Sequence, residues 1–503
     1  MIRNRLRAAR RVVAPTGDLA TRTARSGVWL SISNISQRIL ELVALLVLAR
    51  LLSPAAFGLI GVALLVLTAM ERFSELGFTS ALIQHRDEDI DQYLDTAWTL
   101  QILRGVLLAG ILFGLSGPAA AFFDAPRVEP ILQVIAVIPI LVGLENPGVV
   151  YFQKDLEFHK LFLRLASKTL VYVTVTISLA FVWGTVWALV VGRVAAEVVS
   201  LLVSYLLHDY RPRPGFDLAA AKELVNFGKW IFAGSIVYFL NDEGGDFVIG
   251  WLLGAASLGL YRVSYRLALT PASEVTGVIS TVMFPAYSKL QDDVRAVRET
   301  FLRTVQLVAA LTFPISVGIV VVAPLFVRAV LGPQWTPMIG VFQVLTVYGL
   351  LLSLSGSFSP VWLALGHPDY SAKIGAARVV AMGVLVYPAT TTYGLLGAAG
   401  AIFAAFAFVA FPIDIYVSKD LMDMRIRQYL RELAYPAVAA GTMGLVVWRV
   451  RDAVVLESAL LELFGLIVLG VVVYFLAAAA LVKLFGWKID ENVRGVFSAL
   501  GGS

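Results

Sequence analysis

Residues 26–84 read SGVWLSISNISQRILELVALLVLARLLSPAAFGLIGVALLVLTAMERFSELGFTSALIQ. Two apolar runs flank a short break at 51–56, and each run is long enough to cross a bilayer, for which about 20 residues suffice. Both runs also contain charged residues: Arg38, Glu41, Glu71, Arg72 and Glu75. Charged side chains inside a membrane face protein or water and commonly mark a transport path. The stretch therefore predicts a polytopic membrane protein with a polar interior.

The composition of the whole chain indicates the same class. Its 503 residues are 59% hydrophobic, with a mean hydropathy of +0.81, which is too apolar for a soluble enzyme of this size. There is no cysteine, so disulfides, thiolate metal sites and cysteine nucleophiles are excluded. The first 25 residues hold seven arginines, but no apolar core of a signal peptide follows them. We interpret residues 1–26 as a basic cytoplasmic arm and expect no nucleic-acid partner for the net charge of +5.

A second copy of this stretch follows 201 residues later. Glu41 then falls on Asp242, and Gly58 falls on Gly259. With small insertions allowed, further residues pair in order: Pro118 with Pro324, Gln133 with Gln343, and Gly184 with Gly394. An ordered series of matches at nearly one spacing indicates an internal repeat.

Hydropathy predicts fourteen membrane spans. They lie near 28–50, 57–80, 94–115, 128–150, 161–183, 186–207, 228–251, 257–284, 301–323, 337–364, 374–393, 395–418, 431–449 and 459–483. If the basic arm is inside, most loop Lys and Arg residues are also inside, among them Arg86, Lys154, Lys289, Lys373, Arg378 and Lys419. The outside loops hold only Arg50, Arg127, Arg328, Arg449 and Arg451. This bias places both termini in the cytoplasm.

Because six helices separate the two copies, both copies enter the membrane in the same direction. Parallel repeats of this kind are related by a pseudo-twofold axis along the membrane normal, with the substrate site between them. We therefore expect an all-α integral membrane protein with two parallel six-helix lobes and two C-terminal helices. The predicted parts are an N-lobe at 27–207, a cytoplasmic linker at 208–227, a C-lobe at 228–418, and two extra helices with a cytoplasmic tail at 419–503.

Five motifs carry a resemblance to a known family. They are LLSPAAFGL at 51–59, ELGFTSALIQ at 75–84, YFQKDLEF at 151–158, LGAASLGLY at 253–261 and MFPAYSKL at 283–290. With these motifs the sequence resembles the polysaccharide transporter family, the Wzx-type oligosaccharide flippases of the multidrug/oligosaccharidyl-lipid/polysaccharide exporter superfamily, in particular the colanic-acid-type exporters. The resemblance spans nearly the whole chain.

The resemblance implies a V-shaped bundle of two lobes around a central cavity. It also implies the cargo, a polyprenyl-diphosphate-linked oligosaccharide, which is flipped across the cytoplasmic membrane by alternating access for exopolysaccharide or lipopolysaccharide biosynthesis. An ion gradient or the membrane potential would drive the step. The implied partners are membrane lipids and the glycan polymerase and glycosyltransferases of the same pathway. The alternatives are a cation-coupled multidrug exporter on the same fold and a membrane glycan polymerase or ligase, although no outside loop is long enough for a catalytic domain.

Such a cargo needs fixed cations for its diphosphate. The basic residues inside the predicted spans are Arg38, Arg72, Arg104, Lys168, Arg193, Arg262 and Arg266. We predict substrate binding by Arg38, Arg72, Arg193, Arg262 and Arg266. Arg262 and Arg266 lie four residues apart on one helix face and repel each other, so an anion would neutralise them. The alternatives are ion pairs within the protein: Arg38 with Glu41, Arg193 with Glu197, and Arg262 or Arg266 with Asp242, Asp246 or Glu274.

The acidic residues inside the spans are candidates for ion coupling. Glu41, its repeat partner Asp242, and Asp246 are the residues that we predict for this role. A buried carboxyl that desolvation keeps protonated near neutral pH can carry a proton, whereas pairing with arginine would make it structural. All four histidines fall in or beside predicted inside loops, and the chain has no nucleotide-binding motif or catalytic triad. We therefore expect no metal site, no cofactor and no catalysis.

Overall fold

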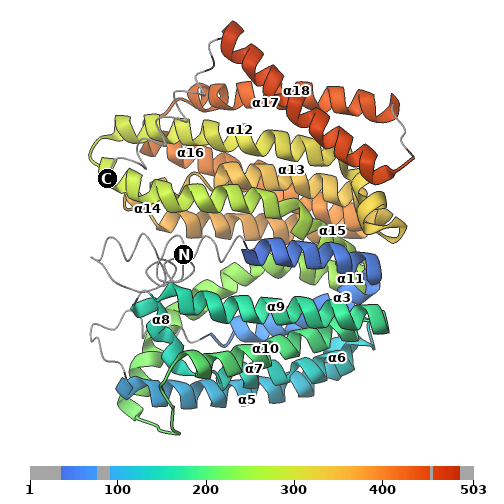
Figure 1. The fold of residues 1–503 in the computed structure, drawn as a ribbon. Helices are drawn as coiled ribbons and strands as arrows, with labels where there is room; N and C mark the ends of the chain where they lie inside the picture. Colours follow the sequence, from blue (N-terminus) through green and yellow to red (C-terminus); the bar gives the residue numbers. More distant parts are fainter. Residues whose placement is uncertain (1–35, 76–90, 156, 454–456, 486, 488–503) are drawn as a thin grey trace, which may run out of the picture. The chain divides into compact units, whose positions relative to one another are not determined.

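The computed structural model describes residues 36–75, 91–155, 157–453, 457–485 and 487, and all elements in these ranges are helices (Figure 1). Residues 36–51 are helical. The α-helices that follow are α3 (Pro54–Arg72), α5 (Asp91–Phe122), α6 (Val128–Ile135), α7 (Val137–Gly143), α8 (Tyr151–Lys154), α9 (Phe158–Trp183), α10 (Trp187–Leu207), α11 (Leu218–Leu290), α12 (Val294–Phe326), α13 (Ile339–Ser355), α14 (Ser359–Ala364), α15 (Asp369–Ala405), α16 (Phe411–Leu421), α17 (Ile426–Ala453) and α18 (Ala459–Phe485). The short helices are η1 (Pro147–Val150), η2 (Val327–Leu331), η3 (Pro333–Met338) and η4 (Phe406–Ala410). The predicted basic arm, Arg86 and most of the predicted tail lie outside the described residues.

Many of the described helices are long and apolar enough to span a membrane. Ten of them are long and apolar enough to cross a membrane, and a pair bent by 72°, Val128–Gly143 with Pro147–Lys154, makes an eleventh candidate. Two of the ten, Ser235–Gly277 and Asp369–Leu421, are far longer than a bilayer requires and are interrupted by a glycine with non-helical backbone. Each of these two helices covers two predicted spans, and the total of fourteen spans stays a prediction. The chain is an all-α, multi-pass membrane protein.

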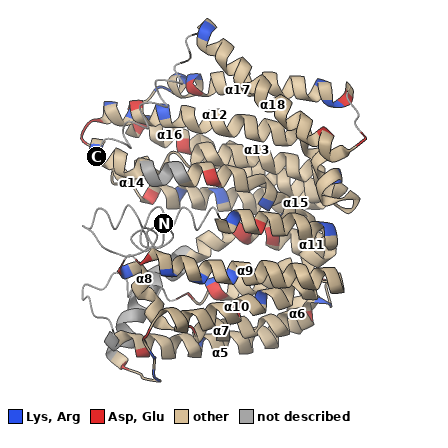
Figure 2. Ribbon diagram, viewed as in Figure 1, with Lys and Arg blue, Asp and Glu red and all other residues tan. Residues whose placement is uncertain are grey.

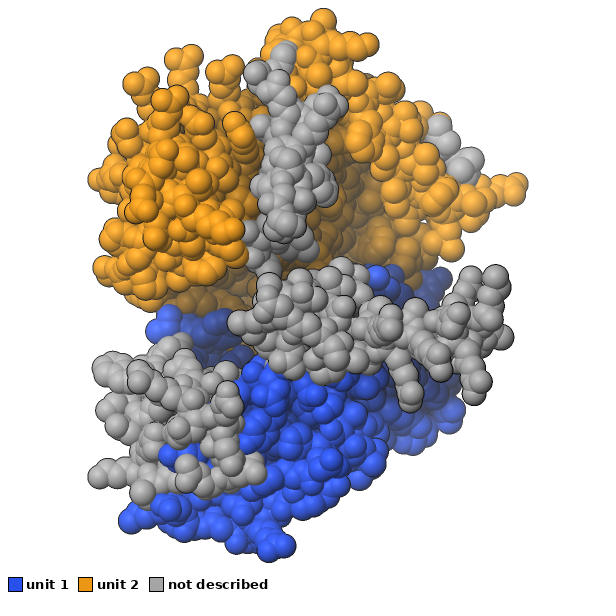
Figure 3. Space-filling view, turned by 60° about the vertical axis from the view of Figure 1, so that its left-hand side comes forward, with its two compact units in different colours: residues 1–239, 254–256 blue, residues 240–253, 257–503 orange. Residues whose placement is uncertain are grey.

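The chain separates into two compact units (Figure 3). Unit 1 contains residues 1–239 and 254–256, and unit 2 contains residues 240–253 and 257–503. The border between them thus runs inside α11. The domain borders expected from the repeat stay a prediction.

The backbone is interrupted at matching positions of the internal repeat. Ser53 and Gly254 are 201 residues apart, and the helix is interrupted at both positions. The Ser53 hydroxyl caps α3 by accepting a hydrogen bond of 3.3 Å from the amide of Ala56. Gly254 has a φ of 75°. The pair Gly184 and Gly394, aligned from sequence, has a φ of 60° at both positions. Side chains other than glycine are strained at such angles. The matching breaks support the interpretation that the two halves are copies of one pattern.

Within unit 1, small residues let helices approach closely. A Cβ atom on Gly105 of α5 would lie 2.4 Å from the carbonyl oxygen of Pro139 on α7, and one on Gly143 would lie 2.6 Å from the carbonyl oxygen of Gln101. Membrane helices gain packing energy from such contacts because lipid offers no hydrophobic driving force between them.

Within unit 2, the two C-terminal helices pack on α12. Ala439, Ala440 and Met443 of α17 are buried in one apolar cluster with Tyr474 of α18. The Tyr474 hydroxyl donates a hydrogen bond of 2.7 Å to the carbonyl oxygen of Ala310 on α12. These helices, although outside the repeat, are part of the packed core of unit 2.

The segment that follows α10 is held against unit 1 along its length. Asp95 on α5 accepts hydrogen bonds from the Tyr210 hydroxyl and the Arg213 amide, both at 2.9 Å. Three further hydrogen bonds join Asn146 Nδ2 to Tyr210 O at 2.8 Å, Gly215 N to Thr99 Oγ1 at 3.1 Å and Asp217 N to Thr96 Oγ1 at 3.1 Å. The predicted linker is therefore fixed over residues 210–217.

Candidate functional site

Charged residues occur along the lengths of the helices as well as at their ends (Figure 2). Within each unit, acidic and basic side chains from different helices meet in clusters. The clusters contain half of the residues that the sequence predicts for the site, and each unit is described separately below.

The first cluster of unit 1 lies between α9 and α10 and centres on Glu197. This side chain is 2% exposed, and its two oxygens contact two cations. Lys168 Nζ on α9 lies 2.6 Å from Oε2, and Arg193 Nε on α10 lies 3.3 Å from Oε1. The predicted substrate-binding residue Arg193 therefore has the ion pair with Glu197 that was its alternative.

A second acid, Glu145, follows α7 and contacts the same two helices. Glu145 accepts hydrogen bonds from Arg164 Nη2 at 3.0 Å and from the Ser200 hydroxyl at 2.6 Å, while Arg164 Nε also contacts Ser200 Oγ at 3.2 Å. We call Glu145, Arg164, Lys168, Arg193, Glu197 and Ser200 the α9–α10 cluster. It contains three basic and two acidic side chains, so it has a surplus of one positive charge.

Two more arginines meet near the end of α3. Arg104 on α5 donates to the Glu71 carbonyl oxygen at 2.8 Å and to Ser74 Oγ at 3.0 Å. Arg72 pairs with Glu75 at 3.1 Å, and its guanidinium carbon lies 5.0 Å from the centre of the Tyr238 ring. The predicted site residue Arg72 is thus held by an acid and an aromatic ring, and a bidentate contact to phosphate would compete with Glu75.

The other predicted residues of unit 1 lie on the first described helix. Arg38 is exposed and Glu41 is half-buried on helical residues 36–51. Their roles in substrate binding and ion coupling stay predictions.

Unit 2 has a cluster centred on Arg262. Arg262 Nη2 donates to Glu243 Oε2 at 2.7 Å, and Arg262 Nε donates to Asp246 Oδ2 at 2.5 Å. Asp246 is 7% exposed, so its charge is stabilised chiefly by this arginine. Arg262 and Asp246 were predicted as substrate-binding and ion-coupling residues, and the structure brings them together with the pairing that was the stated alternative. Their neighbours Arg266 and Asp242 are exposed, and the roles predicted for these two residues are untested.

Two charged residues of unit 2 were missed from sequence. Glu243 was noticed as an acid but given no role, although its spacing of three from Asp246 puts both on one helix face. Arg378 was counted among the inside-loop charges, but the structure places it within α15, where it donates to the Tyr348 hydroxyl at 2.7 Å and lies 5.6 Å from the rings of Tyr348 and Phe406. Its position within the predicted span 374–393 was the signal that could have identified it.

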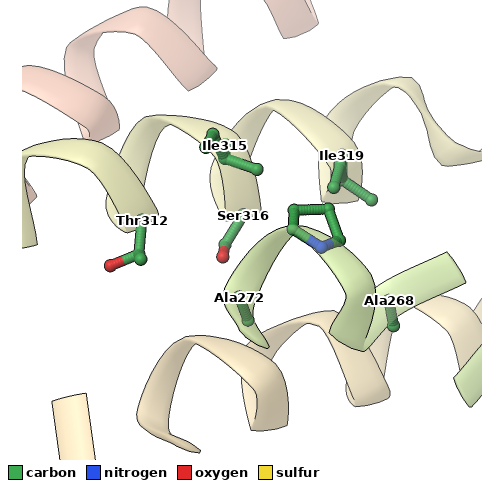
Figure 4. A pocket seen from close by; sticks show the side chains of 7 residues that line it. Ala268, Ala272, Thr312, Ile315, Ser316 and Ile319 are labelled. Carbon is green, nitrogen blue, oxygen red and sulfur yellow. The ribbon is translucent and has the colours of Figure 1, made fainter. Parts of the chain in front are cut away.

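Unit 2 also has a shallow recess between α11 and α12 (Figure 4). Its lining residues are Ala268, Pro271, Ala272, Thr312, Ile315, Ser316 and Ile319. None of these side chains is charged, so this recess has no fixed cation for a phosphate. In the described part of the chain, no three His, Asp or Glu side chains converge on a point where they could hold a metal ion.

The fold and the charged clusters inside the helices together define a multi-pass membrane protein of the transporter class. A family model for "Polysaccharide biosynthesis protein" matches residues 47–340, which is more than half of the chain. The chain belongs to this family, and the resemblance found from the sequence motifs is confirmed.

Several named relatives are similar over most of their length. The lipopolysaccharide biosynthesis protein WzxC of Escherichia coli (strain K12) is 29% identical over 427 residues, which cover 83% of this chain and 85% of that protein. The teichuronic acid biosynthesis protein TuaB of Bacillus subtilis (strain 168) is 25% identical over 434 residues, covering 86% and 89%. The succinoglycan biosynthesis transport protein ExoT of Rhizobium meliloti (strain 1021) is 24% identical over 358 residues, covering 71% and 72%.

Solved structures share the fold. The lipid II flippase MurJ, in an inward closed conformation, matches with a TM-score of 0.74 at 14% identity, covering 91% of this chain and 99% of that one. An inward-facing multidrug resistance MATE family transporter of the MOP superfamily matches with a TM-score of 0.58 at 17% identity, covering 81% and 99%. The predicted all-α fold of this superfamily is confirmed.

Proposed function

We propose that this protein flips polyprenyl-diphosphate-linked oligosaccharide units across the cytoplasmic membrane by alternating access. The proposal is supported by membership of a polysaccharide biosynthesis family and by relatives named for lipopolysaccharide, teichuronic acid and succinoglycan. The MurJ likeness is consistent with it, since that protein is named as a flippase of a lipid-linked substrate. Both termini would be cytoplasmic, and the enzymes that build and polymerise the glycan would act before and after it.

The observation that carries the proposal is the surplus positive charge of the α9–α10 cluster. Fixed charge within membrane-spanning helices is expensive and is found where it serves a polar cargo. Lys168 and Arg193 share one carboxylate, so one of them can turn to an anion while the other still neutralises Glu197. A diphosphate presents acceptor oxygens that suit a guanidinium.

Arg193 gives the sharpest test of the site. We expect Arg193→Gln to lower the flipping rate at least about tenfold, since a charge-assisted hydrogen bond is worth roughly 1.5 kcal/mol or more. Glu197 keeps Lys168 as its partner, so insertion and stability should change little. The measurement uses proteoliposomes that hold a labelled polyprenyl-diphosphate oligosaccharide and an enzyme or reagent that detects it in one leaflet.

The matched control is Arg295→Gln, because Arg295 is 79% exposed and pairs only with Glu299 at the surface. This variant should flip the substrate at the wild-type rate. Equal rates for the wild type and Arg193→Gln would remove Arg193 from the site. A wild-type protein that leaves the lipid-linked glycan in its original leaflet would contradict the proposed function.

The second candidate is a cation-coupled multidrug exporter, which the MATE likeness favours. Cationic drugs prefer cavities lined by acids, whereas the α9–α10 cluster has more basic than acidic groups. Export of cationic dyes by the same proteoliposomes, without flipping of the lipid-linked glycan, would support this candidate.

A further inference from the structure

Unit 2 contains a buried acid that the proposed site does not use. Asp414 lies on α16 and is 2% exposed. Among the described residues, its one hydrogen bond is with the Ser355 hydroxyl at the end of α13, which lies 2.5 Å from Oδ2. No Lys or Arg of the described residues lies within ion-pair distance of it. A carboxylate in a low-dielectric interior needs a cation or several donors, so the ionised form of Asp414 is poorly supported here.

Apolar and aromatic groups surround this acid. Leu354, the neighbour of Ser355, belongs to a cluster in which Phe411 of α16 and Leu433 of α17 pack together. Tyr429 of α17 is fully buried next to Phe358, with ring centres 5.7 Å apart. Its hydroxyl interacts electrostatically with Asp414, yet it makes no hydrogen bond. The Tyr429 hydroxyl can therefore donate a hydrogen bond to the Asp414 carboxyl group or accept one from it.

The other ionisable groups on the surrounding helices are occupied or exposed. On α16, Lys419 and Asp420 lie 3.8 Å apart, with 43% and 62% of their side chains exposed. Three neighbours bond to other groups. Glu432 of α17 contacts Gln306 at 2.6 Å, Arg298 of α12 contacts the Asp423 carbonyl oxygen at 2.6 Å, and Tyr348 of α13 contacts Arg378 at 2.7 Å. Glu274 of α11 is half-buried. Arg303, Arg427 and Arg431 are exposed. η4 and α14 contribute no charged side chain.

We propose that Asp414 is a proton-binding site, and that it is the group through which a proton gradient acts on the transport cycle. The carboxyl group holds its proton while it is enclosed by α13, α16 and α17. It releases that proton to water when the helices part, which leaves a carboxylate, and it takes up a proton before they close again. The coupling role rests on the proposed function, whereas the binding of the proton does not.

This assignment differs from the acids predicted for coupling. Asp246 is paired with Arg262, so a fixed cation competes with a proton for its carboxyl group. Asp242 is exposed and lacks the enclosure that would keep a proton in place. A sodium ion at Asp414 would need several oxygen ligands, but a single carboxylate and one hydroxyl contact each other here.

Infrared difference spectroscopy of the purified, full-length protein tests the inference directly. We expect the wild type to show a carboxylic-acid C=O band that disappears as the pH rises and does not respond to sodium. Asp414→Asn, which keeps the shape and the contact with Ser355, should lack this band. The matched control Asp420→Asn, six residues away on the same helix and exposed, should keep it. An unchanged band in Asp414→Asn, or a band removed by sodium at constant pH, would overturn the inference.

A second measurement covers the case in which Asp414→Asn does not fold. Dicyclohexylcarbodiimide modifies protonated carboxyl groups in apolar surroundings, so mass spectrometry of the treated wild type should find Asp414 modified at low pH, and Asp420 unmodified. No modification of Asp414 at any pH would count against the site. In proteoliposomes, flipping should depend on pH in the wild type but not in Asp414→Asn. An Asp414→Asn variant whose flipping keeps the pH dependence of the wild type contradicts only the coupling role of Asp414. A wild type that shows the band but does not flip the glycan contradicts only the proposed function.

Discussion

Glu197 is a single buried acid that pairs with two basic side chains inside unit 1. Its carboxylate is buried and contacts both Lys168 and Arg193, whose side chains are 26% and 42% exposed. Removing one partner of a buried ion pair leaves an uncompensated charge, which is more destabilising than the pair is stabilising. The acid is therefore the structural centre of the cluster, and the cations are the members free to exchange partners.

We expect Glu197→Gln to lower the free energy of unfolding by roughly 2 kcal/mol, less than the loss for a fully buried pair because water reaches both cations. Thermal unfolding of the detergent-solubilised protein measures the change. Glu299→Gln is the control, since Glu299 and Arg295 form an exposed pair worth under about 1 kcal/mol. Equal melting temperatures for the two variants would show that Glu197 does not hold the cluster.

Composition and helical spacing predict some of the site residues, but not the contacts between residues far apart in the sequence. Arginine in an apolar run marks Arg193 and Arg262, and a spacing of four identifies the partner of Arg193. The partners of Arg262 lie 16 and 19 residues before it, across the break at Gly254, so helical periodicity could not indicate them. For Arg378, the aromatic contacts come from two other helices and leave no local pattern.

Helix packing in unit 1 depends on which glycines lie at a contact with a neighbouring helix. Gly105 and Gly110 lie on the same helix, α5, but only Gly105 meets a neighbouring backbone. A side chain at Gly105 has to displace α7, because the clashing atom belongs to the main chain of Pro139. At Gly110, no atom lies within 4 Å of an added Cβ.

We therefore expect opposite effects from the same substitution. Gly105→Ala should destabilise the protein by about 2 kcal/mol through overpacking. Gly110→Ala should be neutral or stabilising by up to about 1 kcal/mol, since alanine favours the helix. Thermal unfolding in detergent compares them, and a melting temperature of Gly105→Ala at or above that of Gly110→Ala would contradict the packing argument.

Hydropathy predicts where the spanning helices lie but not their bends. The predicted span 128–150 is a pair bent by 72°, and the chain at the bend is capped by Asn146, which accepts from the amide of Gly148 at 2.9 Å. The breaks at Gly254 and Gly394 depend on positive φ angles rather than on any loss of apolar character. Bends and breaks of this kind depend on local backbone geometry, and hydropathy averaged over a window of residues does not detect it.

For the molecule as a whole, the repeat and the distribution of Lys and Arg bear on topology. The paired glycines at 184 and 394 both have a φ of 60°, although their ψ angles differ, at 23° and −141°. The orientation in the membrane is an independent property, and it rests on the excess of basic residues in the predicted inside loops.

A chain without cysteine allows a direct test of that orientation. Arg127 and Asp292 are both exposed, and they lie in loops predicted to be outside and inside. We expect Arg127→Cys to react with a membrane-impermeant maleimide in right-side-out vesicles, and Asp292→Cys to react only after permeabilisation, while the wild type stays unlabelled. Labelling of Asp292→Cys in sealed vesicles would invert the topology.

The segment after α10 limits how this protein can be engineered. Pro212 and Pro214 have no amide hydrogen, while the amides of Arg213, Gly215 and Asp217 all bond to side chains of α5. The bonded positions alternate, as in an extended strand with a two-residue period. Inserting one residue would turn each donor after the insertion away from its acceptor. A reporter domain or a split point belongs elsewhere, even though this stretch looks like a permissive loop.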